Sequence, residues 1–158
     1  MSREVRQVPL DWHHPCEWRQ QWNQKTRRME AVYRFKPLFD RSYADAKAEF
    51  DRDPEDFDNR EPHPSDYMPD FSDHDPETLG YCMYESTTEG TPISPVFRSP
   101  EGLAHWLVYN NASAFADDTA TYEEWMATIK AGWAPSIVVD ASGPHSGVEW
   151  SGRNAVQT

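Results

Sequence analysis

The second half of the chain contains the start signals of two helices, and these constrain the fold more than any other feature. Ser99-Pro100-Glu101 combines an N-capping serine, a proline at the first helical position and an acid in the first turn. Thr121 begins a capping-box pattern with Glu124, and Gly132 stands where that helix ends. The sequence therefore predicts two short helices. Their apolar faces consist of Leu103, Trp106 and Leu107 in the first helix and of Tyr122, Trp125, Met126 and Ile129 in the second.

Short extended segments accompany these helices. Residues 81–86 alternate in polarity and predict a strand, residues 87–92 predict a turn, and residues 93–97 continue extended around Pro95. Residues 136–139 predict another strand, and Gly147 to Trp150 is expected to pair back on it as a hairpin. The predicted fold class is α+β, a small antiparallel sheet with the two C-terminal helices on one face.

The first half of the chain predicts an extended arm and two more helices. Arg3 to Pro9 alternates and is expected to form the arm. An amphipathic helix is predicted from Glu17 to Phe35, and Pro37 limits its extension. Ser42 is expected to cap a shorter helix that Pro54 ends. The longer helix would have an apolar face of Trp18, Trp22, Met29, Val32 and Tyr33 and a basic, amide-rich face of Arg19, Gln20, Lys25, Arg27 and Arg28.

An acidic, proline-rich segment separates the two halves. It cannot form its own core, so it either wraps over the rest of the chain or stays mobile. We favour wrapping, with Phe57, Tyr67 and Phe71 as anchors, because mobile segments are usually poor in aromatic residues. The expected organisation is an N-terminal arm with helices (1–51), the connecting segment (52–79) and an α+β module (80–158), together forming one compact unit.

Charge narrows the class of partner. The net charge of −12 argues against direct nucleic-acid binding and suits solubility, a basic partner or imitation of a polyanion. Residues 1–36 hold eight basic and four acidic side chains, whereas residues 37–79 hold four basic and fourteen acidic ones. No apolar stretch reaches the length of a membrane span, and the first ten residues lack a signal-peptide pattern. Cys16 and Cys82 have no short spacing, which favours a reduced, cytoplasmic location.

Motifs for metal binding and catalysis are weak. His13, His14 and Cys16 are suitable zinc ligand types, but no second pair stands at zinc-site spacing, so we predict no metal site. The acidic run from Asp51 lacks the glycine and the final glutamate of a calcium loop. No nucleophile motif or phosphate-binding loop is present, so no cofactor is predicted and catalysis is disfavoured without being excluded.

Two groups of residues are the candidate binding sites. The turn at residues 87–91 presents hydroxyls and a carboxylate between extended segments, which suits hydrogen bonding to a ligand, although such hydroxyls also satisfy their own turn. The first group consists of Tyr84, Glu85, Thr87, Thr88, Glu89, Gly90, Thr91 and Ser94. The second group is the acidic patch of Asp51, Asp53, Glu55, Asp56 and Asp58, which could imitate nucleic-acid phosphates.

Several of these motifs resemble those of a group of small tailed-bacteriophage proteins that carries no assigned activity. The run from Tyr84 to Phe97 is similar to a recurring stretch in that group, as are Thr119 to Trp125 and Ser146 to Glu149. The start of the chain is similar as well, and the resemblance covers the first fifteen residues and nearly everything from Ser65 onward. Some members carry Cys-x-x-Cys pairs after the opening motif, where this chain has only Cys16.

The resemblance implies a phage-encoded protein in the host cytoplasm. The first hypothesis is a non-enzymatic accessory protein that binds a host protein and thereby supports host takeover or blocks a defence. The second is a virion-associated or self-assembling structural protein, in which the basic and acidic regions join copies. The third is an enzyme or a binder of a small, nucleotide-like ligand that uses the threonine-rich turn.

Overall fold

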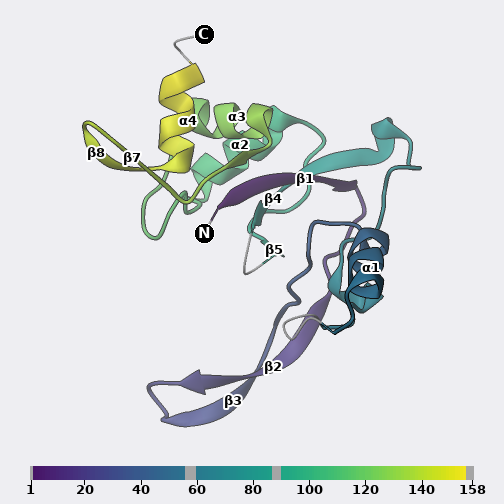
Figure 1. Cartoon of the computed structure of the whole chain (residues 1–158). Helices are drawn as coiled ribbons and strands as arrows, with labels where there is room; N and C mark the ends of the chain where they lie inside the picture. The colour runs from purple at the N-terminus through teal and green to yellow at the C-terminus, as the bar shows by residue number, and fades with distance from the viewer. Residues whose placement is uncertain (1, 56–59, 87–89, 156–158) are drawn as a thin grey trace.

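The computed structural model describes residues 2–55, 60–86 and 90–155. A four-stranded antiparallel sheet lies at its centre, in the order β5-β4-β1-β6 (Figure 1). The N-terminal arm is a central strand of this sheet, because it pairs with β4 over its whole length. The predicted α+β class is confirmed. The strands are β1 (Arg3–Pro9), β4 (Leu79–Glu85), β5 (Thr91–Pro92) and β6 (Trp133–Ala134).

Three helices gather on one face of the sheet. They are α2 (Pro100–Tyr109), α3 (Tyr122–Ala131) and α4 (Gly147–Ala155), with α4 packed on α3. The Ser99 hydroxyl accepts a hydrogen bond from the Gly102 N–H at 3.0 Å, and Thr121 and Glu124 form both halves of a capping box. Gly132 ends α3 with a φ of +89°, a left-handed conformation that favours glycine. Both helix starts are therefore confirmed.

The main core lies between the sheet and these helices. Side chains alternate along the strands, so Val5 and Met83 face the helices while Val8 and Tyr84 face the opposite side. Trp125 is fully buried at the centre of the helical side. The buried members of this core are Met83, Leu103, Ala104, Leu107, Ala114, Trp125, Ile129, Ala134 and Val148.

The acidic connecting segment covers the opposite face. It contains two short 3-10 helices, η1 (Pro64–Asp66) and η2 (Pro76–Thr78). The Phe71 ring meets the Trp12 ring edge-on at 5.3 Å, and the Tyr67 ring lies 5.4 Å from the Phe39 ring. The predicted anchoring is thus confirmed for Tyr67 and Phe71, while Phe57 lies outside the described residues.

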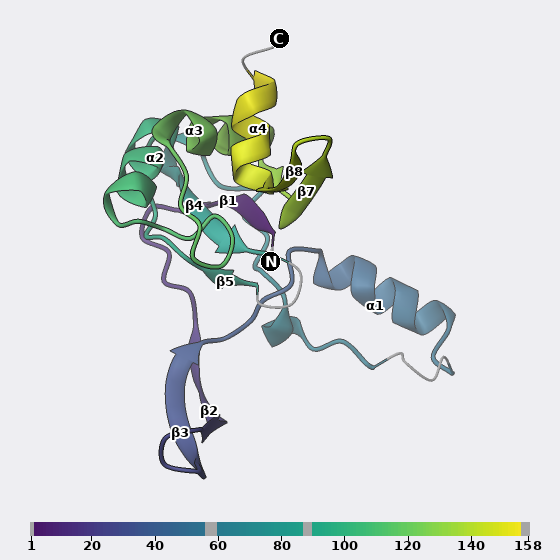
Figure 2. The ribbon, with the colours of Figure 1, turned by 90° about the vertical axis from the view of Figure 1, so that its left-hand side faces the viewer.

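The predicted helix from Glu17 to Phe35 is wrong. The region forms a hairpin of β2 (Cys16–Asn23) and β3 (Arg28–Phe35), which extends away from the sheet in both views (Figures 1 and 2). Its turn is set locally, because the Asn23 side-chain oxygen accepts hydrogen bonds from the backbone N–H groups of Lys25 and Thr26. Glu30 accepts hydrogen bonds from Asn23 and Thr26, and these lower the pKa of its carboxyl group.

The helix predicted after Ser42 is confirmed. It is α1 (Tyr43–Arg52), and the Ser42 hydroxyl accepts a hydrogen bond from the Asp45 N–H at 3.3 Å. Figure 2 shows α1 projecting from the sheet in a different direction from the β2–β3 hairpin. Within the described ranges, none of the helices has both the length and the apolarity needed to cross a lipid bilayer.

A small hairpin precedes α4. It consists of β7 (Ile137–Asp140) and β8 (Gly143–Ser146), so the strand predicted at residues 136–139 is confirmed. The expectation that Gly147 to Trp150 pairs with this strand is wrong, because those residues begin α4. Ser146 explains the change: its hydroxyl accepts a hydrogen bond from the Glu149 N–H at 3.1 Å and caps the helix.

Candidate binding sites

A buried arginine organises the face of the sheet opposite the helices. Arg6 is only 5 % exposed, and its guanidinium donates to the Glu4 carboxylate at 2.9 and 2.6 Å. It also donates to the Leu38 carbonyl at 3.1 Å and lies 4.2 Å above the centre of the Tyr84 ring. The guanidinium therefore fixes the chain after the β2–β3 hairpin against the sheet.

The Tyr84 hydroxyl connects two further side chains. Trp12 Nε1 donates to it at 3.1 Å, and His14 Nδ1 lies 3.0 Å away. His14 Nε2 lies 2.6 Å from the Lys36 carbonyl oxygen. Burial raises the pKa of Tyr84, and the hydrogen bond from Trp12 opposes that change. These residues hold the base of the β2–β3 hairpin against the sheet.

His14 should make the stability of the folded chain depend on pH. Burial lowers the pKa of His14 below the usual histidine value of 6.5. The hydrogen bond with the Lys36 carbonyl opposes this decrease, and the Arg6 charge adds to it. The unfolded chain therefore takes up a proton near pH 6.5 that the folded chain resists. The contribution of His14 to the free energy of unfolding is therefore full above pH 6.5 and falls as the pH drops below that value. We expect a lower urea midpoint at pH 5 than at pH 7.

A His14→Gln variant is the control for this pH effect. It removes the titrating ring, so the difference between the urea midpoints at the two pH values should shrink. An unchanged difference in the variant would assign the effect to the carboxylates. Asp140, whose pKa is lowered to about 2 chiefly by a hydrogen bond with the Ser142 side chain, is not among these, because it titrates below that range.

Two cavities lie beside Arg6. Arg6, Asp40 and Arg41 line both of them. The smaller cavity, of about 710 Å³, lies near the base of the β2–β3 hairpin and is also bordered by Ser86 and Gly90. Its lining is mixed in charge. Its other charged residues are Glu4, Glu17, Arg19, Lys36 and Asp66.

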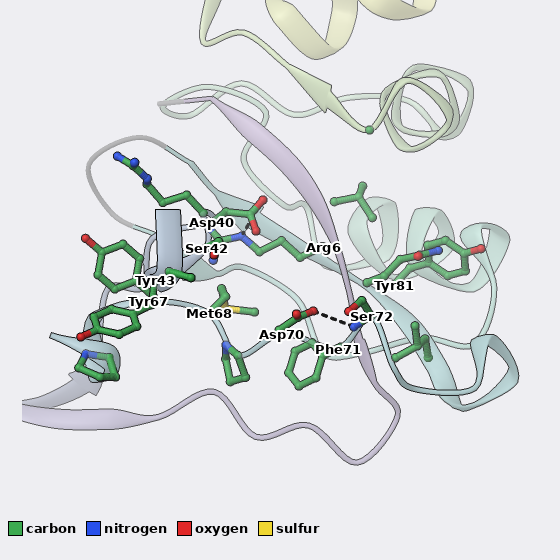
Figure 3. Close-up of a pocket in the computed structure, with 18 of the residues that line it drawn as sticks. Arg6, Asp40, Ser42, Tyr43, Tyr67, Met68, Asp70, Phe71, Ser72 and Tyr81 are labelled. Carbon is green, nitrogen blue, oxygen red and sulfur yellow. Dashed lines mark hydrogen bonds and ion pairs between the residues drawn. The ribbon is translucent and has the colours of Figure 1, made fainter. Parts of the chain in front are cut away.

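The larger cavity, of about 1100 Å³, opens beside β1, and we call it the edge cleft. Figure 3 shows Arg6 reaching from β1 toward Asp40, with Met68, Asp70 and Phe71 from the connecting segment nearby. Tyr43 and Tyr67 lie at one end of the view and Tyr81 at the other. The edge cleft therefore combines aromatic side chains, charges of both signs and the backbone of β1.

The β2–β3 hairpin has two chemically different faces. In the antiparallel register, Trp18 is opposite Tyr33 and Trp22 is opposite Met29, so these four side chains share one face. Phe35 extends that face toward the base of the hairpin. We call the five residues the aromatic face. Their exposed fractions are 69 % for Trp18, 60 % for Tyr33, 55 % for Trp22, 54 % for Met29 and 44 % for Phe35.

The opposite face of the hairpin is polar and basic. Its paired positions include Glu17 with Arg34 and Asn23 with Arg28. Residues 16–35 hold five basic and two acidic side chains, whereas the rest of the chain holds ten basic and twenty-five acidic ones. The hairpin is thus a locally positive arm on an acidic protein.

The residues that the sequence grouped around the threonine-rich turn have different environments in the structure. Tyr84 is fully buried in the cluster with Arg6, and Glu85 forms an ion pair with Arg3 at 3.3 Å. The Ser94 hydroxyl accepts a hydrogen bond from the Met83 N–H at 2.9 Å, a structural role beside β4. Thr91 belongs to β5, and Gly90 borders the smaller cavity. Thr87, Thr88 and Glu89 lie outside the described residues.

The proposed acidic patch lies at the end of α1. Asp51, Asp53 and Glu55 are exposed there, while Asp56 and Asp58 lie outside the described residues. Lys47 pairs with Asp51 at 2.8 Å, which neutralises part of the patch. Sequence reasoning grouped four of the five residues of the aromatic face on one side of a predicted helix, but it did not propose them as a binding surface. It missed the edge cleft, which depends on pairing between distant strands.

Metal ligation finds no support in the part of the chain that the structure describes. Within it, no three His, Cys, Asp or Glu side chains are grouped so that they could hold an ion. His14 uses both ring nitrogens in contacts with Tyr84 and Lys36. Burial raises the pKa of the Cys82 thiol to about 11, so that thiol is a weak nucleophile and ligand.

Comparisons of the chain with protein-family models, with curated proteins and with solved structures gave no match.

Proposed function

We propose that this chain is a non-catalytic, phage-encoded accessory protein that binds a host protein through the aromatic face of the β2–β3 hairpin. The single observation behind the proposal is that this face is exposed although it holds two tryptophans, a tyrosine, a phenylalanine and a methionine. Large exposed apolar side chains gathered on one face mark interaction sites, and tryptophan and tyrosine are the commonest energetic anchors of interfaces. The resemblance to phage proteins favours a host cytoplasmic protein as the partner.

The construction of the hairpin supports a docking role. A two-stranded hairpin is marginally stable by itself, yet this one is anchored at its base by Lys36, which pairs with Asp66 at 3.0 Å, and by the contact of the Phe35 and His14 rings. The Trp18 and Tyr33 rings lie 5.1 Å apart across the strands and stiffen the half of the hairpin nearer its base. A rigid aromatic surface loses little conformational entropy on binding.

The test is an affinity pull-down from infected host cells, read by quantitative mass spectrometry. The wild-type chain is compared with a Trp18→Ser/Trp22→Ser variant. Loss of two anchors should reduce retention of the partner about 30-fold or more. Because both side chains are largely exposed, the melting temperature should change by only about 2 °C.

Gln21→Ser is the matched control, because Gln21 lies on the same strand but on the polar face. This variant should retain the partner as the wild type does. A host protein that is retained equally by all three proteins would show that the aromatic face is not the contact.

Self-assembly is the second candidate function. The separation of positive and negative charge along the chain favours self-assembly, because the positive hairpin of one copy could dock on the acidic body of another. Light scattering at low and high salt distinguishes the two candidates. A concentration-dependent dimer that dissociates as salt rises would support assembly, and a monomer at every concentration would rule assembly out.

A further inference from the structure

The outer edge of β1 is only partly covered. On one side β4 pairs with all seven residues of β1, but on the other side β6 pairs only with Arg3 and Glu4. The Val5 N–H then donates to the Gly132 carbonyl at 2.8 Å, and the chain turns away into α3. Beyond Val5, none of the strands in the described ranges lies beside this edge of β1.

The backbone of Gln7 points toward this open edge. Gln7 stands opposite Tyr81 in β4, but Tyr81 exchanges both of its backbone hydrogen bonds with Phe97, at 2.7 and 2.9 Å. The pair is therefore a non-hydrogen-bonded one, and the Gln7 N–H and C=O are directed away from β4. An edge with free donors and acceptors is a template for a further strand.

This edge forms the floor of the edge cleft. Val5, Arg6 and Gln7 line it, with Ile129 and Gly132 on the helical side. The opposite wall comes from Asp70, Phe71 and Ser72 of the connecting segment (Figure 3). A space of about 1100 Å³ beside an unpaired strand has room for an extended chain that pairs with this edge.

The charges in the edge cleft indicate which kind of extended peptide it would bind. Arg6 is paired with Glu4, and Arg41 is paired with Glu49 at 2.7 Å, so the charge of each cation is already offset by a carboxylate. Asp40 lies 4.0 Å from Arg6 with its side chain 55 % exposed. The Asp70 carboxylate accepts a hydrogen bond from the Ser72 N–H, and it too is exposed. Two carboxylates therefore remain to meet a positive charge.

The geometry points to a peptide-binding site, in which an extended segment carrying a basic residue adds as a strand along Val5 to Pro9 and continues the pairing that β6 begins. Its main chain pairs with Gln7, and its basic side chain faces Asp70 and Asp40. The covered edge ends at Val5 and Pro9 ends β1, so the site holds about five residues at roughly 3.3 Å each. This inference goes beyond the hairpin proposal and depends on different residues.

The probe is an acetylated and amidated pentapeptide, Val-Lys-Val-Lys-Val, titrated into the full ¹⁵N-labelled chain. We expect binding in the high micromolar range or weaker, a shift of the Gln7 amide resonance and slower hydrogen exchange at that amide. The peptide Val-Glu-Val-Glu-Val should bind about tenfold more weakly, and Asp70→Asn should weaken the lysine peptide about threefold.

Two tests show whether the peptide binds by main-chain pairing with Gln7. Gln7→Pro removes the N–H at an edge position that tolerates proline and should weaken binding about tenfold, whereas Gln7→Ala keeps the N–H and should bind as the wild type does. If Gln7→Pro fails to fold, lysine peptides N-methylated at one residue each test the pairing from the peptide side, because the residue opposite Gln7 then loses the N–H that donates to the Gln7 carbonyl. The inference is overturned by equal binding of the two peptides, by shifts confined to the hairpin, or by no shift at millimolar peptide.

Discussion

Replacing Arg6 by methionine is expected to lower the free energy of unfolding by about 3 kcal/mol, because methionine fills the space but supplies no charge and no donor. The substitution leaves the Glu4 carboxylate without its cation and the buried Leu38 carbonyl without its hydrogen bond. It also removes the cation above the Tyr84 ring. Urea unfolding followed by tryptophan fluorescence at pH 7 measures the change.

A double-mutant cycle separates the charge effect from loss of packing. The variant with methionine at both Glu4 and Arg6 leaves neither member of this pair without its partner, so it should be about 2 kcal/mol more stable than the two single losses predict. Arg6→Lys keeps the charge but loses the two-pronged contact, and should fall between the wild type and Arg6→Met. A loss under about 1 kcal/mol for Arg6→Met would show that water replaces the guanidinium at no cost.

The elements that could be predicted are those whose signals are local. Ser42, Ser99 and Thr121 each cap a helix through a side chain only three residues from the N–H that it accepts. Such hydrogen bonds form within one turn, so neighbouring residues are sufficient to recognise them. The same pattern is present at Ser146 and Glu149, where a competing expectation of a strand obscured it.

The error at residues 17–35 has a simple cause in the spacing. Trp18 and Trp22 are four residues apart, as are Met29 and Tyr33, and a spacing of four keeps two side chains on one face of a helix or of a strand. The turn at residues 23–28 decides in favour of two strands rather than a helix. Asn23 closes it with side-chain hydrogen bonds, and Arg27 adopts a φ of +51°, which reverses the chain.

The candidate sites were harder to predict because distant residues build them. The cluster of Arg6, His14 and Tyr84 brings together residues that lie up to 78 positions apart in the sequence. The edge cleft forms only because β1 lies between β4 and β6 in the sheet. Sequence reasoning assigned Tyr84 to a binding surface from its neighbourhood in the chain. Its burial depends instead on which strand lies beside it and on what covers that face.

Replacing Gly147 by alanine is expected to destabilise the C-terminal unit of β7, β8 and α4 by about 3 kcal/mol. A Cβ at this position would lie 2.0 Å from the Pro135 carbonyl oxygen and 2.7 Å from its carbonyl carbon. Both atoms belong to the backbone, so no rotation of a side chain relieves the contact. The first turn of α4 must therefore move away from the segment that enters β7. Hydrogen exchange measured by mass spectrometry should show lost protection in residues 147–155.

Gly143→Ala is the matched control in the same unit. Gly143 has a φ of +118°, which strains an alanine, but no atom lies within 4 Å of the added Cβ. Its cost should therefore be about 1 kcal/mol, with α4 still protected. Equal loss of protection in the two variants would show that backbone strain in this unit, and not the contact with Pro135, limits its stability. Full protection in Gly147→Ala would show that α4 has room to shift and that the close packing at Pro135 is not needed to hold it.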